Sequence, residues 1–413
     1  MAVTTNESVR QTDNIARRAH KEAASLTAFR RELHANPELG FDLPNTSAAV
    51  QRELAAIGVE HRAGFAEGHG IVAHIPATAG GDASGAIALR ADMDALPIEE
   101  QTGRAWASKT PGKMHACGHD GHTAILVGTA RVLASLDERP NPVTLIFQPA
   151  EEGGGGGEVM CDDGALAGEA GGGLGPKVER IFGLHGWPDQ PLGTLASKTG
   201  PVLAATDDFE LTVVGEPGHA AMPHKARDPI VAASAIVAAL QTLASRVADP
   251  VDPIVCTVGS IHGGFANNVI PAEVKLVGTV RTLSADARTR AASAFRRIVE
   301  STAGAHGCDV KIDWHEGYPV TVNNDAATAK FFDVVRGRFG DDIVRTVPAP
   351  FMGGEDFSYY GHHAEACFYM LGLLPEGEDP ATTPKLHQPT FDFNDDAIAT
   401  GVEAMCALAL AGR

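Results

Sequence analysis

The stretch MHACGHDGHTAILVGTARVLASLDERPNPVTLIF, residues 114–147, decides the fold of this chain. It opens with one thiol, three imidazoles and a carboxylate in residues 114–122, continues as a helical pattern over 123–136, and ends in the apolar run 143–147. A loop rich in possible metal ligands, followed by a helix and a buried strand, is typical of a sheet flanked by helices that carries its chemistry at one edge.

Other parts of the N-terminal half repeat this alternation of strands and helices. Three more apolar runs have the length of buried strands, at 70–75, 86–90 and 181–184. Helical patterns occupy about residues 15–35 and a segment that Thr46 and Ser47 would cap and that ends near Ile57. We therefore expect an α/β fold with a mostly parallel, mixed sheet between helices.

A second pattern begins near residue 205, where strand, helix, two strands, helix and strand follow one another. The expected elements are 208–214, 228–247, 254–262, 273–283, 285–305 and 310–314. This order resembles the small ferredoxin-like α+β sandwich with a split β-α-β arrangement. We predict a discontinuous catalytic domain of residues 1–204 and 317–413, interrupted by an inserted α+β domain at 205–316.

Composition limits the partners and the compartment. The chain has 33 Lys and Arg against 52 Asp and Glu, a formal charge of -19 that repels nucleic acids and anionic membrane surfaces. The apolar run around Ile230–Leu240 is too short to cross a bilayer, so no membrane is expected. The six cysteines are scattered, and Met1–Ser8 lacks a secretory pattern, which favours a reducing cytoplasm.

Cys117 and His119 are the first candidate metal ligands. One glycine separates them, so a tight loop can direct both side chains to one point, and thiolate and imidazole both suit borderline transition metals. Taken alone, Cys117 could equally be a small buried hydrophobe and His119 a polar residue with ordinary hydrogen bonds. We interpret His115 and His122 as supporting residues, because one short loop cannot direct every imidazole at one centre.

Glu151 and Glu152 follow the expected strand 143–147 and precede the glycine run 153–157. Adjacent carboxylates on an irregular segment can point in different directions, so that one binds metal and the other moves protons. An acidic pair beside glycines is otherwise a solvated turn. Its position at the same expected sheet edge as Cys117 favours the metal site.

His185 and His387 complete the candidate set. Each of them, by itself, is more typical of a structural histidine near the end of an element. Counted with Cys117, His119 and Glu152, however, they give five ligands. Two adjacent divalent ions in a two-metal hydrolase need about that number.

Seven motifs together resemble a known family. They are RADMDALP (90–97), MHACGHDGH (114–122), FQPAEE (147–152), GLH (183–185), GHAAMPH (218–224), NVIP (268–271) and GEDF (354–357). In this order they resemble the metal-dependent amidohydrolases that include hippurate hydrolases, N-acyl-amino-acid amidohydrolases and indole-acetyl-amino-acid hydrolases, relatives of di-zinc aminoacylases and carboxypeptidases. The resemblance implies a zinc-peptidase-like catalytic domain split by an inserted dimerisation domain.

The resemblance also implies roles for individual residues. The bridging thiolate falls on Cys117, the general base on Glu151, and the remaining ligands on His119, Glu152, His185 and His387. Asp94 matches an acidic position that supports the site in relatives, but their His-x-Asp pattern is replaced here by Asp92-Met93-Asp94. We therefore place Asp94 outside the ligand set.

Three residues of the inserted domain match substrate-contacting positions. The resemblance implies that His219 reaches across a dimer to stabilise an oxyanion at the partner's metals, and that Asn268 and Arg281 hold the substrate's carbonyl and carboxylate. His219 could instead be a turn histidine and Arg281 a surface charge. A guanidinium is well shaped for bidentate carboxylate binding, which favours the substrate role.

The sequence thus predicts an enzyme with two divalent ions per subunit, Zn, Mn, Co or Ni, that hydrolyses the amide bond of N-acyl amino acids. We expect a homodimer or homotetramer formed through the inserted domain. Two alternatives stay open: a dipeptidase or aminopeptidase on the same scaffold, and a non-catalytic metal-binding homologue. The second is disfavoured because a binding protein has no need for a base such as Glu151 beside its ligands.

Overall fold

The structure is a computed structural model that describes residues 4–78, 80–81 and 84–411. The chain divides into two compact units. The larger consists of Met1–Val202, Val322–Pro348 and Asp356–Arg413, and the smaller of Leu203–Thr321 and Ala349–Glu355. The smaller unit thus also takes in residues 349–355, beyond the predicted insertion. The ends of the predicted catalytic domain, residues 1–3 and 412–413, lie outside the described residues.

The larger unit is built on an eight-stranded mixed sheet with the order β1-β2-β4-β3-β5-β16-β6-β15. The central strands β4, β3, β5 and β16 run parallel to one another, while β2 is antiparallel to β4 and β6 is antiparallel to β16. The strands are β1 (Glu60–Phe65), β2 (Gly70–Ile75), β3 (Ala86–Asp92), β4 (Val143–Gln148), β5 (Val178–Pro191), β6 (Leu195–Ser197), β15 (Val344–Thr346) and β16 (Glu365–Leu374). This sheet confirms the predicted fold class.

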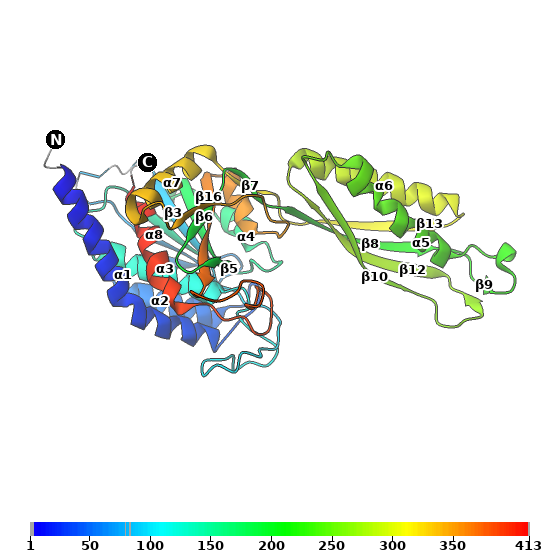
Figure 1. Cartoon of the computed structure of the whole chain (residues 1–413), viewed down its shortest axis with the longest axis horizontal. Helices are drawn as coiled ribbons and strands as arrows, with labels where there is room; N and C mark the ends of the chain where they lie inside the picture. The colour runs from blue at the N-terminus through cyan, green and yellow to red at the C-terminus, as the bar shows by residue number, and fades with distance from the viewer. Residues whose placement is uncertain (1–3, 79, 82–83, 412–413) are drawn as a thin grey trace. The chain divides into compact units, whose positions relative to one another are not determined.

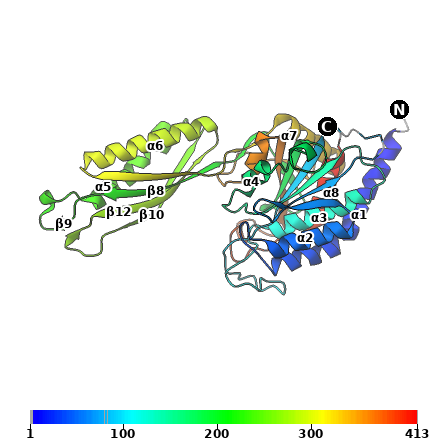
Figure 2. The ribbon, with the colours of Figure 1, turned by 180° about the vertical axis from the view of Figure 1, so that it is seen from behind.

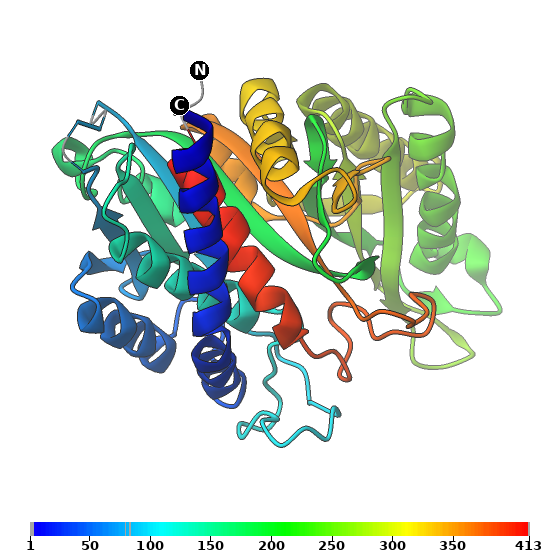
Figure 3. The same cartoon turned by 60° about the vertical axis from the view of Figure 1, so that its left-hand side comes forward.

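Helices pack against this sheet and on one another. They are α1 (Thr4–His34), α2 (Pro44–Ala56), α3 (His119–Ala134), α4 (Gly156–Asp162), α7 (Asp325–Phe339) and α8 (Ile398–Leu410). The helices α1, α3 and α8 contact each other, and α3 and α8 also contact β3 and β5 (Figures 2 and 3). Their apolar faces form one continuous core, in which Leu26, Ile125 and Val402 are fully buried.

Several boundaries differ from the prediction: α1, for example, begins at Thr4 rather than near residue 15, and distant residues set two of the others. α2 begins at Pro44, where the carboxylate of Glu38 accepts the N–H groups of Asn45 and Thr46, so Thr46 and Ser47 are not its cap. α3 begins at His119, four residues earlier than expected. β5 continues beyond His185, since β16 pairs with it as far as Pro191.

The smaller unit has a four-stranded antiparallel sheet with the order β10-β12-β8-β13 and two long helices (Figure 1). Its main elements are β8 (Ala205–Val214), α5 (Pro229–Leu240), β10 (Ile254–Gly263), β12 (Glu273–Thr282), α6 (Ala285–Ala305) and β13 (Asp309–Glu316). α5 and α6 cover one face, where Phe209, Ile236 and Phe295 are fully buried. The element order agrees with the prediction, and the dimerisation role stays a prediction.

Short elements complete both units. They are β7 (Gly200–Leu203), β9 (Gly218–His219), β11 (Val269–Ile270), β14 (Thr321–Asn323), η1 (Glu169–Gly171), η2 (Pro223–Lys225), η3 (Leu243–Val247), η4 (Asp356–His362) and η5 (Asp395–Ala397). The two residues of β9 pair with β11, and this small ladder brings His219 opposite Val269.

The helical run that includes α5 agrees with the expected helix 228–247, and it extends beyond the apolar run Ile230–Leu240. With the π-helical turn η3 it extends over Pro229–Val247, 19 residues, which by length and composition alone could cross a membrane. Of the most apolar stretch of 18 residues in this run, 28% is buried. Ala232, Ile236 and Leu240 of α5 pack into the core of the smaller unit. This is the arrangement of a helix that covers a sheet, so the feature is weak evidence for a membrane.

Candidate metal centre

Chemically active side chains gather where β3 and β4 end. Asp92 is the last residue of β3, Glu151 and Glu152 follow β4 after a short turn, and His185 lies within β5. Cys117 precedes the first turn of α3. Because β3, β4 and β5 run parallel, their carboxyl ends meet at one edge of the sheet, where ligands usually bind in such folds.

The five predicted ligands come together as two groups that share one atom. Cys117, His119 and His185 form one group, and Cys117, Glu152 and His387 form the other, with the candidate ligand atoms of each group within 4.8 Å of one another. The Cys117 Sγ atom lies 3.4 Å from His185 Nε2 and 3.3 Å from His387 Nε2. A thiolate in this position could contact two cations at once.

The donor set fits a cation, as the buried nitrogen of His119 indicates. Its Nδ1 donates to the backbone oxygen of Asp94 at 2.9 Å, which leaves Nε2 as the inward atom. That Nε2 is buried and has no hydrogen-bond partner among the described residues, while carboxylates of Asp92 and Glu152 lie 3.7 and 4.0 Å away. A buried nitrogen without a partner is costly, and a metal ion would satisfy it.

The electrostatics of Cys117 also favour a bound cation. Burial, and then the carboxylates of Glu152 and Glu151, raise the pKa of the Cys117 thiol well above its usual range. The thiolate that a metal requires therefore needs positive charge beside it. Burial lowers the pKa of His185 far below its ordinary value, with His122 adding to the effect, so His185 is neutral and able to donate a lone pair.

His122 and His115 lie outside both of these groups, and their supporting role stays a prediction. His122 Nδ1 donates to Asp92 Oδ1 at 2.6 Å, and its Nε2 accepts the N–H of Gly186 at 2.7 Å, so both ring nitrogens are in use. His115 is 1% exposed, and burial lowers its pKa to about 3. His122 thus links β5 to β3, and it also forms a further group of possible ligand atoms with Asp92 and His119.

Asp94 has a role that the sequence left open. Its Oδ1 accepts the backbone N–H of Glu151 and its Oδ2 that of Glu152, each at 3.0 Å. Its backbone oxygen accepts His119 Nδ1–H. The carboxylate of Asp94 therefore orients the candidate base and the candidate ligand Glu152, and its backbone oxygen orients the candidate ligand His119.

The backbone is strained at two points of the site. Ala150, directly before the glutamate pair, and His387 have φ values of 57° and 64°, in the left-handed region that side chains seldom adopt. The strained conformation of His387 is held by its N–H, which donates to the oxygen of Ala116 at 2.8 Å. Such strain is often found at functional sites.

Gly118 explains how Cys117 and His119 can converge. Its φ is 87°, which favours glycine, and an added Cβ would lie 3.0 Å from the ring of Phe393. The left-handed residue forms the N-cap of α3, so the chain turns sharply between the two candidate ligands.

A fully buried polar network beside the site was not predicted. Arg90 donates to Asp92, Gln148 and Asp356 at 2.7–2.8 Å, and Gln148 also donates to Asp356. Burial raises the pKa of Asp356 to about 6, although Arg90 opposes the effect. The only sequence signals were RADMD and GEDF, which hold Arg90, Asp92 and Asp356.

The three predicted substrate residues all lie in the smaller unit. His219 and Asn268 are exposed and adjacent on the β9–β11 ladder, where Ala220 N–H donates to the Asn268 oxygen at 3.0 Å. Arg281 lies near the other end of β12, opposite Thr206 of β8. The structure thus brings His219 and Asn268 together, and separates Arg281 from them along the strand.

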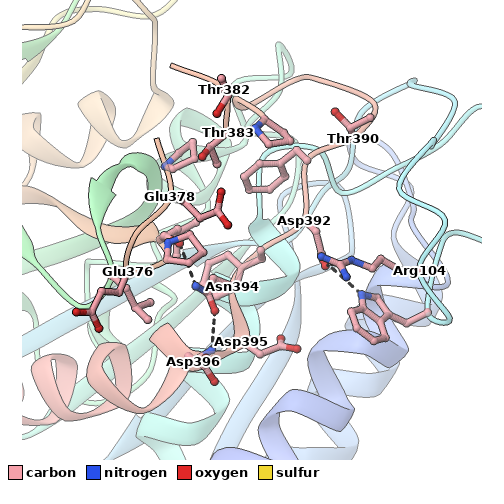
Figure 4. Close-up of a pocket in the computed structure, with 18 of the residues that line it drawn as sticks. Arg104, Glu376, Glu378, Thr382, Thr383, Thr390, Asp392, Asn394, Asp395 and Asp396 are labelled. Atoms are coloured by element: carbon pink, nitrogen blue, oxygen red, sulfur yellow. Dashed lines mark hydrogen bonds and ion pairs between the residues drawn. The ribbon is translucent and has the colours of Figure 1, made fainter. Parts of the chain in front are cut away.

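A large cavity lies in the segment that carries His387. It has a volume of about 730 Å³ and is lined by Arg104, Trp106 and acidic residues that include Glu376, Glu378 and Asp392 (Figure 4). None of the predicted metal ligands lines it. The cavity therefore does not mark the metal centre.

Comparison with known proteins identifies the family. The chain belongs to peptidase family M20/M25/M40, whose profile matches residues 88–411. It is 39% identical to the N-acetyl-L-cysteine deacetylase of Bacillus subtilis over 375 residues, which cover 90% of this chain and 84% of that protein. It is 38% identical to IAA-amino acid hydrolase ILR1-like 2 of Arabidopsis thaliana, over 93% of this chain and 84% of that protein.

A solved structure supports the same conclusion. The YXEP protein of Bacillus subtilis, described as a dinuclear metal binding peptidase from the M20 family, superposes with a TM-score of 0.78 and 32% identity. The match covers 95% of this chain and 98% of that one. The resemblance inferred from the seven motifs is thereby confirmed.

Proposed function

We propose that this protein is a di-metal amidohydrolase that cleaves the amide bond of N-acyl amino acids into a carboxylic acid and a free amino acid. The observation that carries the proposal is the sharing of Cys117 by two groups of ligand atoms. The named activities of relatives at 38–39% identity, a deacetylase of an N-acetyl amino acid and an IAA-amino acid hydrolase, support the substrate class.

Two divalent ions would occupy the two groups. Cys117 would bridge them, with His119 and His185 on one ion and Glu152 and His387 on the other. Mixed thiolate, imidazole and carboxylate donors admit Zn, Mn, Co or Ni. When bound, such ions supply Lewis acidity toward the amide carbonyl and lower the pKa of a nearby water.

Glu151 would move the proton. It is 6% exposed, its Oε2 lies 4.0 Å from His119 Nε2, and it belongs to neither group around Cys117. Asp94 holds its backbone in place. Glu151 would take a proton as water oxygen bonds to the amide carbon, and would return that proton to the nitrogen as the C–N bond breaks.

Arg281 would bind the free carboxylate of the amino acid. It is half-buried on β12 and has no hydrogen-bond or ion-pair partner among the described residues. The backbone of Gly354, in the GEDF motif, passes beside its guanidinium: a Cβ there would lie 3.6 Å from Nη1. A guanidinium without a carboxylate partner is suited to a carboxylate ligand.

His219 would stabilise the oxyanion, and Asn268 would hold the carbonyl. The Nδ1 atom of His219 accepts the N–H of Ala221 at 3.0 Å, so the proton of the neutral ring lies on Nε2, which is then a donor. The ladder that carries His219 and Asn268 lies just before Glu273, the first residue of β12. Arg281 is eight residues farther along that strand, about 27 Å at the usual rise of a strand. That separation exceeds the length of one substrate molecule and supports the use of His219 and Asn268 from a second subunit.

The smaller unit offers a surface for that second copy. β10 is an edge strand of ten residues, and the face of α5 away from its sheet exposes Ile230 and Val231 at 41% and 51%. Ile261 on β10 and Phe265 after it are 48% and 85% exposed. An unpaired edge beside exposed apolar side chains is suited to a homodimer, or a homotetramer, built through the inserted domain.

The proposed compartment is the cytoplasm. All six cysteines are free thiols, and Cys117 is needed in reduced form. A reducing environment would keep it so.

The test compares Glu151→Gln and Glu152→Gln, each loaded with Zn or Mn, for metal content and for turnover of N-acetyl, N-benzoyl and indole-acetyl amino acids. Glu151→Gln should keep both ions and lose turnover by about 100-fold or more, while Glu152→Gln should lose one ion. Loss of metal in Glu151→Gln alone would overturn the assignment. Free dipeptides serve as the counter-panel: faster cleavage of these would favour a dipeptidase, and no turnover of either panel a non-catalytic protein.

A further inference from the structure

Arg30 lies on α1 with a fully buried side chain, outside both groups of ligand atoms. Its Nε donates to Asp120 Oδ2 at 2.7 Å and its Nη2 to Asp392 Oδ1 at 2.5 Å, while Nη1 reaches Asp395 at 3.5 Å. A single guanidinium thus joins segments that are distant in the sequence, and each of them carries predicted ligands.

One of these segments is the loop that leads into α3. Asp120 directly follows His119 and lies in the first turn of that helix. His34, one turn after Arg30 on α1, contacts the same Asp120 oxygen through Nδ1 at 2.8 Å. The position of Asp120, and hence of Cys117 and His119 next to it, is therefore fixed from α1.

The other segment carries His387. Asp392 follows it by five residues, and Arg104 and Trp106 also contact that carboxylate, at 3.1 and 3.3 Å. His387 itself lies on irregular backbone, and its side chain is 53% exposed. Of the five predicted ligands it is the most exposed, since the side chain of Glu152 is 13% exposed and the other three residues are buried.

We propose that Arg30 is a positioning residue for the metal centre: by joining Asp120 to Asp392 it sets the separation of Cys117 from His387. The inference rests on the proposed two-metal function. The planar fork of a guanidinium has a fixed geometry, so it transmits the position of one carboxylate to the other. The group of Cys117, Glu152 and His387 depends on this link because it combines ligands from both of the joined segments. The group of Cys117, His119 and His185 does not include a residue of the segment that carries Asp392.

The test measures the affinity of Zn²⁺ for each of the two sites, by competition with a chelator of known affinity, in the full-length protein. Arg30→Met and Asp392→Asn both cut the link, and each should weaken the second equivalent of metal by about 10–100-fold, the usual effect of losing a group that orients a ligand. In Asp392→Asn, which leaves Arg30 and His34 on Asp120, the first equivalent should bind nearly as in the wild type.

Two controls separate positioning from general damage. Arg338→Met breaks an ion pair in the same unit, with Glu403, whose side chains are 7% and 12% exposed. Arg104→Met removes only an exposed contact to Asp392, because Arg104 is 56% exposed. Both controls should bind the two equivalents as the wild type does.

Wild-type affinity for the second ion in folded Asp392→Asn would overturn the proposal, as would an equal loss in Arg338→Met. If Arg30→Met does not fold, Asp392→Asn decides alone, because it removes one side of the link and leaves Arg30 paired with Asp120. A wild-type protein that binds fewer than two ions would contradict the proposed function instead.

Discussion

The carboxylate of Asp94 accepts the backbone N–H of Glu151 at 3.0 Å, and this contact orients the candidate base from the segment that follows β3. The second oxygen of Asp94 does the same for Glu152. A single side chain therefore determines how the glutamate pair faces the metal groups.

Replacing Asp94 should consequently lower kcat strongly, while the variant should still fold. In Asp94→Asn an amide N–H₂ would face a backbone N–H, and a hydrogen bond to a charged group, worth about 1.5–3 kcal/mol, would be lost. We expect kcat to fall at least about tenfold while the variant still unfolds cooperatively. Steady-state kinetics and urea denaturation check this, and wild-type kcat would contradict it.

His34 makes the stability of the larger unit depend on pH. Burial alone would lower the pKa of His34, but Asp120 and Glu100 raise it from 6.5 to about 9. Because the folded value lies above the unfolded one, this contribution is complete below about pH 6.5 and disappears as the pH rises through about 9. A rise of this size is worth about 3 kcal/mol.

The difference in unfolding free energy between wild type and His34→Gln should therefore be largest near pH 6 and should shrink by about pH 10. Urea denaturation at both pH values measures it. A difference that grows with pH would show that His34 is buried in its neutral form.

Gly118 should not tolerate a side chain. Gly118→Ala places a Cβ at a φ of 87° and 3.0 Å from Phe393, whereas Gly112→Ala has a similar φ of 73° with no atom within 4 Å. The free energy of unfolding of the control, Gly112→Ala, should fall only by the cost of a left-handed backbone conformation, about 1–2 kcal/mol. That of Gly118→Ala should fall by more. Equal losses in thermal or urea unfolding would mean that the contact with Phe393 is relieved without cost.

The supply of His219 by a second subunit can be tested by mixing two inactive variants. His219→Ala and Glu151→Gln should each have little activity alone. After dissociation and reassociation, half of the dimers are hybrids with one intact site each, so about a quarter of wild-type activity should return. If His219 acts within its own chain, the mixture stays inactive.

Much of the fold follows from local patterns. The strand Gly70–Ile75 and the helix Ala285–Ala305 agree with the sequence-based ranges at both ends. The ends of an apolar run, or of an amphipathic helix with a capping residue, can be recognised from the residues themselves. The start of α2 was missed because its cap is Glu38, outside the helix pattern. The periodicity of a helix carries no information about such a partner.

In the candidate site, too, some residues could be proposed from local sequence and others could not. Five ligands could be proposed from residue type and from strand ends, which parallel strands bring to one edge. The contact of Asp94 with Glu151 spans 57 residues and that of Arg30 with Asp120 spans 90, so the sequence alone does not reveal either pairing. Long-range pairing of this kind appears only when the chain is folded.

The central claim is that one thiolate, Cys117, serves two metal ions. Titration of the metal-free protein with Co²⁺ tests it, with the near-ultraviolet thiolate-to-cobalt absorption recorded at each addition. We expect this absorption to change through both the first and the second equivalent, and to be absent in Cys117→Ser. A signal that is complete after one equivalent, or one that persists in Cys117→Ser, would contradict the claim.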